Sequence, residues 1–157
     1  MPAIFDYRHL VREDEIDDQG HVNNLRHLAW MQSAAIAHSS AQGWTPERYR
    51  ETGAGWVVRT HFIEYRQSAF AADEIVVRTW VTGFQKVTSV RKYLIVRPRD
   101  GALIAIAETN WAYVGFQTRL PRRIPRELIA AFDVVPPERE PPSGEPRDDR
   151  ARESLAE

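Results

Sequence analysis

The chain contains no cysteine, which excludes disulfides, a thiolate nucleophile and metal ligation through sulfur. Only two of its 21 basic residues are lysines, and 22 acidic residues bring the net charge to −1. A nucleic-acid-binding protein is usually clearly basic, so nucleic acid is not expected as a partner. No apolar run approaches the roughly 18 residues of a membrane-spanning helix, so no membrane partner is expected either.

Several motifs are also missing. The first residues lack a basic segment followed by an apolar one, so no signal peptide is predicted and a cytoplasmic protein is the default expectation. No P-loop or GxGxxG motif occurs, and we therefore predict no bound cofactor. The acidic run 13–18 lacks EF-hand spacing, and no His-rich ligand set accompanies it, so no metal site is predicted.

The composition divides the 157 residues into two parts. From Pro136 onwards there are five prolines and eleven charged residues, with a net charge of −3, which leaves residues 1–135 at +2. So polar a segment buries too little apolar surface to offset the entropy of ordering it. We predict one folded domain over 1–135 and a disordered, charged, proline-rich tail over 136–157.

The pattern of the domain is that of an α+β protein. A helix is expected over 23–42, closed by Gly43, and a short one over 126–132. The helix over 23–42 carries apolar residues on nearly all faces, which predicts burial all round. Segments rich in β-branched and aromatic residues, or with alternating polarity, predict strands over 5–12, 56–66, 74–84, 87–98 and 102–117. Short connections make the sheet antiparallel, and the simplest assembly wraps it around the one long helix.

The most informative segment is Asp17-Asp18-Gln19-Gly20-His21-Val22-Asn23-Asn24, directly before the long helix. Asp17 supplies a carboxylate that can act as nucleophile or general base. Gly20 permits a sharp turn and a close approach of a ligand, and Asn23 or Asn24 can cap the helix. The first turn of a helix has free N–H groups that can stabilise an oxyanion. A carboxylate beside such donors is a minimal acyl-transfer site.

A structural interpretation of the same residues is also open. Acidic residues before a helix are common, Asn is an ordinary cap, and composition alone cannot choose between Asp17 and Asp18 as the catalytic group. The carboxylates of Glu13, Asp14 and Glu15 are expected to be solvated in a loop. For His27, a satisfied interior histidine is weighed against a residue that lines an acyl pocket.

Several segments in order resemble the 4-hydroxybenzoyl-CoA thioesterase family of hotdog-fold proteins. The active-site loop and helix start match at Asp17 to Asn24, and plant acyl-carrier-protein thioesterases resemble the same loop. Further similarity lies at Trp30, Gly55–Val58, Phe62–Arg66, Ala72–Ile75 and Arg119–Leu128. The resemblance implies a five-stranded antiparallel sheet wrapped around the helix, with two protomers joined edge to edge as a homodimer or homotetramer and active sites at their interface.

The resemblance also implies roles for individual residues. Asp17 matches the catalytic carboxylate, the backbone N–H of Asn24 matches the donor that polarises the thioester carbonyl, and His21 and Gln19 match polar positions of the plant enzymes. Gly20, Asn23 and His27 are expected to contact the substrate. Because coenzyme A carries a phosphate and a pyrophosphate, its binder should offer cations. The cations for which the resemblance makes this role plausible are Lys86, Arg122 and Arg123.

These observations favour an acyl-CoA thioesterase, an enzyme that hydrolyses an acyl-CoA to the free acid and coenzyme A. Two alternatives stay open: an acyl-carrier-protein thioesterase and a non-catalytic module that binds acyl-CoA. The acyl chain, and the choice between nucleophile and general base for Asp17, do not follow from the residues.

Overall fold

A computed structural model describes residues 3–143. One five-stranded antiparallel sheet runs in the order β1-β3-β4-β5-β2, so β1 and β2 are its edges. The strands are β1 (Phe5–Leu10), β2 (Ala54–Tyr65), β3 (Glu74–Phe84), β4 (Thr88–Arg97) and β5 (Ala102–Gly115). The helices are α1 (Asn24–Ala41), α2 (Pro46–Thr52) and α3 (Arg126–Ala130), with 3-10 turns at Glu13–Glu15 and Pro137–Arg139. The α+β hotdog prediction is confirmed.

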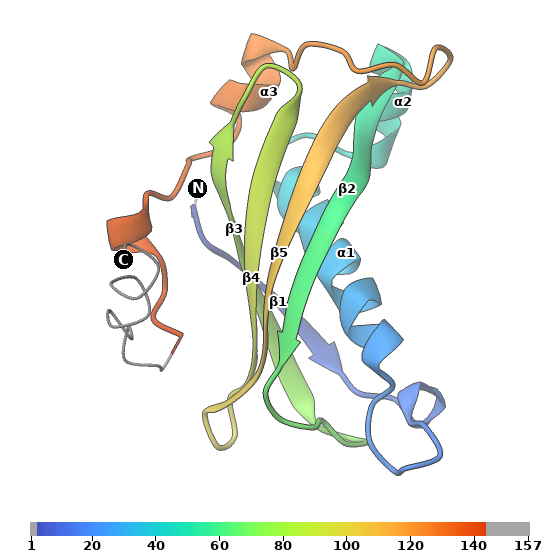
Figure 1. Cartoon of the computed structure of the whole chain (residues 1–157), viewed down its shortest axis with the longest axis vertical. Coiled ribbons are helices and arrows are strands. Elements are labelled where there is room, and N and C mark those ends of the chain that lie inside the picture. Colours follow the sequence, from blue (N-terminus) through green and yellow to red (C-terminus); the bar gives the residue numbers. More distant parts are fainter. Residues whose placement is uncertain (1–2, 144–157) are drawn as a thin grey trace, which may run out of the picture.

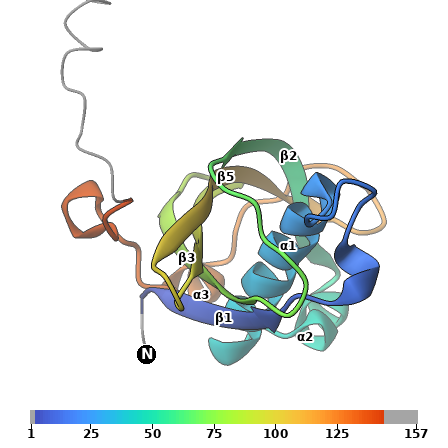
Figure 2. The same cartoon turned by 90° about the horizontal axis from the view of Figure 1, so that it is seen from below.

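The sheet curves around α1 (Figure 1), and the view along the molecule shows the helix inside the curve with β1 and β2 on either side (Figure 2). The face of α1 toward the sheet includes Trp30, Met31 and Ala34, which join buried residues of β3, β4 and β5 in the main core. No helix within residues 3–143 is both long and apolar enough to cross a membrane.

The expectation that α1 is buried on all faces is wrong. The side of α1 away from the sheet is open, and Leu25 and Ile36 are 71% and 54% exposed. A single sheet can cover only one side of a helix, and small residues such as Ala29 and Ser33 occupy much of the open side. The open side of α1 therefore presents an apolar stripe, made of Leu25, Ala29 and Ile36, beside the edge strand β2.

Helix α2 was not expected from the sequence, although its ends carry recognisable signals. The Thr45 side chain accepts a hydrogen bond from the Arg48 N–H at 3.2 Å, and Pro46 occupies the first turn. Gly53 ends the helix with a positive φ of 77°, a conformation that favours glycine. The helix brings Tyr49 over the start of β2, where its hydroxyl accepts from Trp56 Nε1 at 3.1 Å.

Part of the expected tail is described. Residues 137–139 form a 3-10 turn, and Glu140 pairs with Lys92 of β4 at 3.0 Å. Residues 144–157 lie outside the described residues, so disorder of that segment and a domain boundary at 135 stay predictions.

A buried carboxylate fastens the segment before α1 to the core. Glu15 is 3% exposed, and its Oε2 accepts from Trp30 Nε1 at 2.7 Å. Its Oε1 accepts from the Arg12 N–H at 3.0 Å and lies 2.6 Å from His9 Nε2. Burial by itself would raise the pKa of Glu15, but these hydrogen bonds outweigh it and hold the pKa below its ordinary value. The expectation of a solvated Glu15 is therefore wrong, because its neighbours supply three donors.

A second polar cluster lies between the other half of α1 and the sheet. Arg91 of β4 is 6% exposed and donates from Nη1 to His38 Nδ1 at 2.9 Å and to Thr79 Oγ1 at 3.1 Å. Burial, with the nearby Arg91 charge, lowers the pKa of His38 to about 3. The imidazole is therefore neutral at pH 7 and accepts through Nδ1, which places its proton on Nε2.

We predict that Glu15→Gln lowers the free energy of unfolding by about 1.5–3 kcal/mol, the range of hydrogen bonds to a charged group. A neutral amide accepts these bonds more weakly and turns an N–H toward a donor. Glu13→Gln, at an exposed neighbour, should change stability by less than about 0.5 kcal/mol. Urea unfolding of both variants checks this. Equal losses of unfolding free energy in the two variants would show that the hydrogen bonds of the Glu15 carboxylate do not stabilise the fold.

We predict that the buried His38 makes the free energy of unfolding decrease as the pH falls. Between an ordinary pKa near 6.5 and the folded pKa of about 3, the unfolded chain binds a proton that the folded chain does not. The free energy of unfolding therefore falls by about 1.4 kcal/mol per pH unit in that window, and the effect vanishes above it. His38→Asn keeps an acceptor for Arg91 and should remove this slope in urea unfolding between pH 4.5 and 7.5. Parallel wild-type and variant curves would contradict the assignment, because a loss of packing shifts stability equally at every pH.

Candidate functional site

The segment before α1 folds into a tight turn around Asp17. The Gly20 N–H donates to the Asp17 carbonyl at 3.0 Å, and the Asp17 N–H donates to the His21 carbonyl at 2.9 Å. Gly20 has a φ of 86°, which favours glycine. The Gln19 N–H donates to Asp17 Oδ1 at 2.9 Å, so the backbone of the turn orients the carboxylate. Asp18, the competing carboxylate, is exposed.

The turn also gathers the polar side chains around His21. The Nδ1 atom of His21 lies 3.4 Å from Asp17 Oδ2, and its Nε2 lies 3.1 Å from Gln19 Oε1. The side chains of Asp17 and His21 are about one-third exposed. The carboxylate is thus within reach of solvent and of a group able to carry a proton.

Asn23 and Asn24 occupy different positions at the helix start. Asn23 is the cap: its side chain accepts from the Leu25 N–H at 2.9 Å, and its carbonyl accepts from the Arg26 N–H at 2.9 Å. Asn24 is the first helical residue. Within residues 3–143 its own N–H meets no acceptor, which leaves one free donor at the positive end of the α1 dipole.

A cavity of about 240 Å³ lies at this helix start. Its lining comes from the loop, α1 and the end of β2 with the segment that follows: His21, Val22, Asn24, His27, Tyr65, Arg66, Gln67 and Ser68. His27 is 2% exposed and packs against Trp30 and Tyr65. Burial lowers the pKa of His27, although hydrogen bonding to the Asn23 and Asn24 backbone opposes this shift, so His27 is a neutral imidazole.

The end of β2 closes the other side of this cavity. The Tyr65 hydroxyl donates to the Asn24 carbonyl at 3.0 Å, which ties the strand to the helix start. Glu64 pairs with Arg66 at 3.0 Å at this end of the strand. No group of three or more metal-ligating side chains is found in the part of the chain that the structure describes.

The three predicted phosphate-binding cations lie away from this cavity. Lys86 is in the turn between β3 and β4, where its carbonyl accepts from the Ile124 N–H at 2.9 Å. That bond places Lys86 beside the segment that contains Arg122 and Arg123. All three side chains are exposed. The turn between β3 and β4 and the segment that leads into α3 lie at the end of the sheet opposite the loop before α1 (Figure 1).

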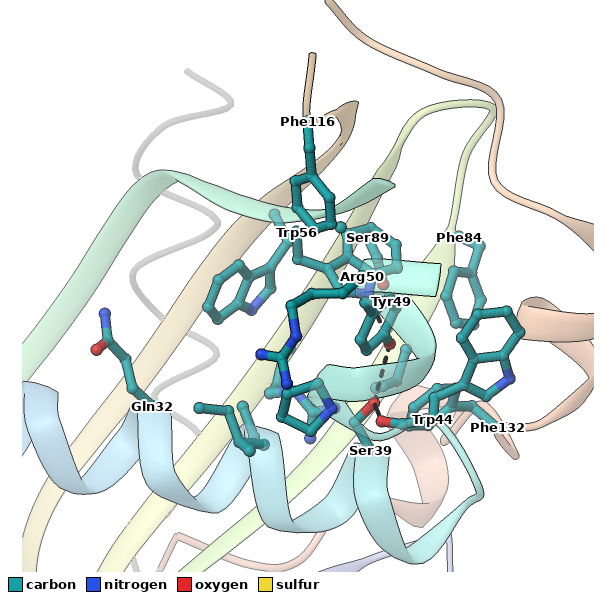
Figure 3. A pocket seen from close by; sticks show the side chains of 17 residues that line it. Gln32, Ser39, Trp44, Tyr49, Arg50, Trp56, Phe84, Ser89, Phe116 and Phe132 are labelled. Atoms are coloured by element: carbon teal, nitrogen blue, oxygen red, sulfur yellow. Dashed lines mark hydrogen bonds between the residues drawn. The ribbon is translucent and has the colours of Figure 1, made fainter. Parts of the chain in front are cut away.

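A larger cavity, of about 420 Å³, lies along the second half of α1 (Figure 3). Seven of its 17 lining residues are aromatic, with Trp44, Trp56, Phe84 and Phe132 among them, and Gln32 and Arg50 also line it. Arg91 lines it as well. The sequence analysis did not single out Arg91, yet its place in the alternating pattern of β4, with buried Ser89 and Tyr93 two residues to either side, indicates an inward side chain.

Solved structures support the fold. A 1,4-dihydroxy-2-naphthoyl-CoA thioesterase from Synechocystis superposes with a TM-score of 0.76 at 18% identity, over 82% of this chain and 95% of that one. The DHNA-CoA thioesterase of Staphylococcus aureus gives 0.72 at 23% identity, over 76% and 80%. An acyl-ACP thioesterase from Bacteroides thetaiotaomicron gives 0.74 at 21% identity, over 89% and 58%. At these identities the likeness shows a shared fold.

The sequence itself carries the family assignment. A family model described as the thioesterase-like superfamily matches residues 11–132, well over half of the chain. The matched range spans the loop with Asp17, the whole of α1 and all the strands except β1. The prediction of a thioester hydrolase is thereby confirmed: this chain belongs to the thioesterase-like superfamily.

Proposed function

We propose that this protein is an acyl-CoA thioesterase that hydrolyses an acyl-CoA to a carboxylic acid and free coenzyme A. The observation that carries the proposal is the free N–H of Asn24, because Asn24 and His21 line a cavity at the start of α1 and the oriented Asp17 carboxylate lies against His21. The finer resemblance to the 4-hydroxybenzoyl-CoA thioesterase family, at the Asp17 to Asn24 segment, supports the same assignment.

In this proposal the thioester carbonyl lies on the first turn of α1, with its oxygen toward the Asn24 N–H. Attack at the carbonyl carbon places a negative charge on that oxygen, and the N–H and the helix dipole stabilise it. One such donor is worth about 2.7–4 kcal/mol of barrier in a measured enzyme. When the tetrahedral intermediate collapses, the C–S bond breaks and coenzyme A leaves as a thiolate.

Asp17 supplies the attack. As general base it takes a proton from a water molecule, whose oxygen forms the new C–O bond, and that proton then passes to the thiolate. As nucleophile it forms an anhydride that water later hydrolyses. The Gln19 N–H holds one carboxylate oxygen in place for either route, and His21 lies 3.4 Å from the other.

The remaining predicted residues serve this geometry. Gly20 shapes the turn, Asn23 caps the helix so that only its neighbour's N–H stays free, and Gln19 and His21 surround the carboxylate. His27 lines the cavity as a neutral imidazole, where its ring can contact the substrate.

Two protomers joined through β2 would complete the site. Strand β2 is an edge with exposed Val57, Phe62 and Tyr65, and the apolar stripe on α1 lies beside it. An exposed apolar edge favours pairing. Because antiparallel self-pairing brings the far end of one protomer toward the helix start of the other, the cluster of Lys86, Arg122 and Arg123 can then reach the coenzyme A phosphates.

We predict that Asp17→Asn lowers kcat/KM at least a hundredfold across short, long and aromatic acyl-CoAs, measured as thiol release. The amide keeps the bond from the Gln19 N–H but can neither accept a proton nor attack. Asp18→Asn is the matched control, since this exposed neighbour should change kcat/KM by less than threefold.

The outcomes separate the candidate functions. A larger loss in Asp18→Asn than in Asp17→Asn would overturn the catalytic assignment. Turnover of acyl-carrier-protein thioesters with none of acyl-CoAs would favour the carrier-protein enzyme. Tight acyl-CoA binding with no turnover of either class would favour the non-catalytic module.

A further inference from the structure

The 420 Å³ cavity has an apolar wall and one unusual polar group (Figure 3). Most of its hydroxyls are already committed to the protein. Ser39 Oγ donates to the Trp44 carbonyl at 2.8 Å and accepts from the Tyr49 hydroxyl at 2.9 Å, and Ser89 Oγ donates to the Gly83 carbonyl at 2.8 Å. These groups therefore stabilise the walls and have little capacity left for a ligand.

Arg91 is different, because its charge is buried without an opposite charge. Its Nη1 donates to the neutral groups His38 and Thr79, and no carboxylate among residues 3–143 lies within ion-pair distance. A guanidinium has five N–H donors, so the Nε–H and Nη2–H groups remain. Their planar fork matches the two oxygens of a carboxylate.

The same strand provides a comparison. Arg97 of β4 is buried to the same extent, at 7% exposed, but it pairs with Asp73 and Asp100, each at 2.9 Å. Burying a charge is costly unless a partner compensates for it. The fold supplies two carboxylates to Arg97 and none to Arg91, and Arg91 is the one of the two that lines a cavity.

We propose that this cavity holds the far end of the substrate's acyl group and that Arg91 binds a carboxylate there. The substrates would then be thioesters of dicarboxylic acids, with one carboxyl joined to coenzyme A and the other free. This inference rests on the proposed function. From Asn24 to His38, which Arg91 contacts, α1 advances about 21 Å, so the acyl group must be long and must extend along the helix from the thioester site.

The test compares thioesters that differ only at the far end: dodecanedioyl with dodecanoyl, tetradecanedioyl with tetradecanoyl, and hexadecanedioyl with hexadecanoyl-CoA. For at least one pair, wild type should favour the carboxylate-ended member at least tenfold in kcat/KM. Arg91→Met should reduce that ratio at least tenfold, mainly through KM. Arg8→Met removes an exposed guanidinium on β1 that does not line the cavity, and it should change the ratio less than threefold.

Calorimetric binding to Asp17→Asn keeps the test independent of catalysis and of the folding of Arg91→Met. Tighter binding of the carboxylate-ended member supports the inference even if no thioester is turned over, a result that would contradict only the proposed function. Equal or weaker binding and turnover of the carboxylate-ended members in all three pairs, or no binding of any member, would overturn it.

Discussion

The site depends on the buried Glu15 carboxylate and the donors around it. Trp30 of α1 and the Arg12 N–H after β1 both bond to this one group, so the carboxylate joins the first strand to the central helix. The Asn23 N–H also donates to the Glu15 carbonyl at 2.9 Å, which closes the loop onto its own beginning. Only the short turn with Asp17 projects beyond this closure, and its position relative to the start of α1 is therefore set by the core.

The two ends of α1 carry different parts of the proposed chemistry. The first turn offers a free N–H, a carboxylate held by one backbone bond, and a small cavity lined by the neutral His27. The second half borders a larger aromatic cavity with the uncompensated Arg91 charge. Reaction at one end and selection of the acyl group at the other are compatible with a single rigid helix, because neither function needs α1 to move.

The sequence predicted the parts of the fold that local patterns specify. The asparagines before an apolar run marked the start of α1, and the β-branched segments marked the strands. Helix α2 was missed although Thr45, Pro46 and Gly53 signal its ends. Glu15 could not be placed, because a run of acidic residues gives no sign that His9 and Trp30 converge on one of them from distant elements. Arg91 likewise could not be singled out, because only the tertiary structure shows that its partners among residues 3–143 are the neutral His38 and Thr79.

The central claim is that the thioester carbonyl lies on the first turn of α1, polarised by the Asn24 N–H. The direct measurement is the infrared stretching frequency of a carbonyl-labelled acyl-CoA bound to Asp17→Asn, which keeps the thioester intact. The account predicts a shift to lower frequency relative to the same thioester in water. An unshifted or higher frequency in the bound state would contradict it.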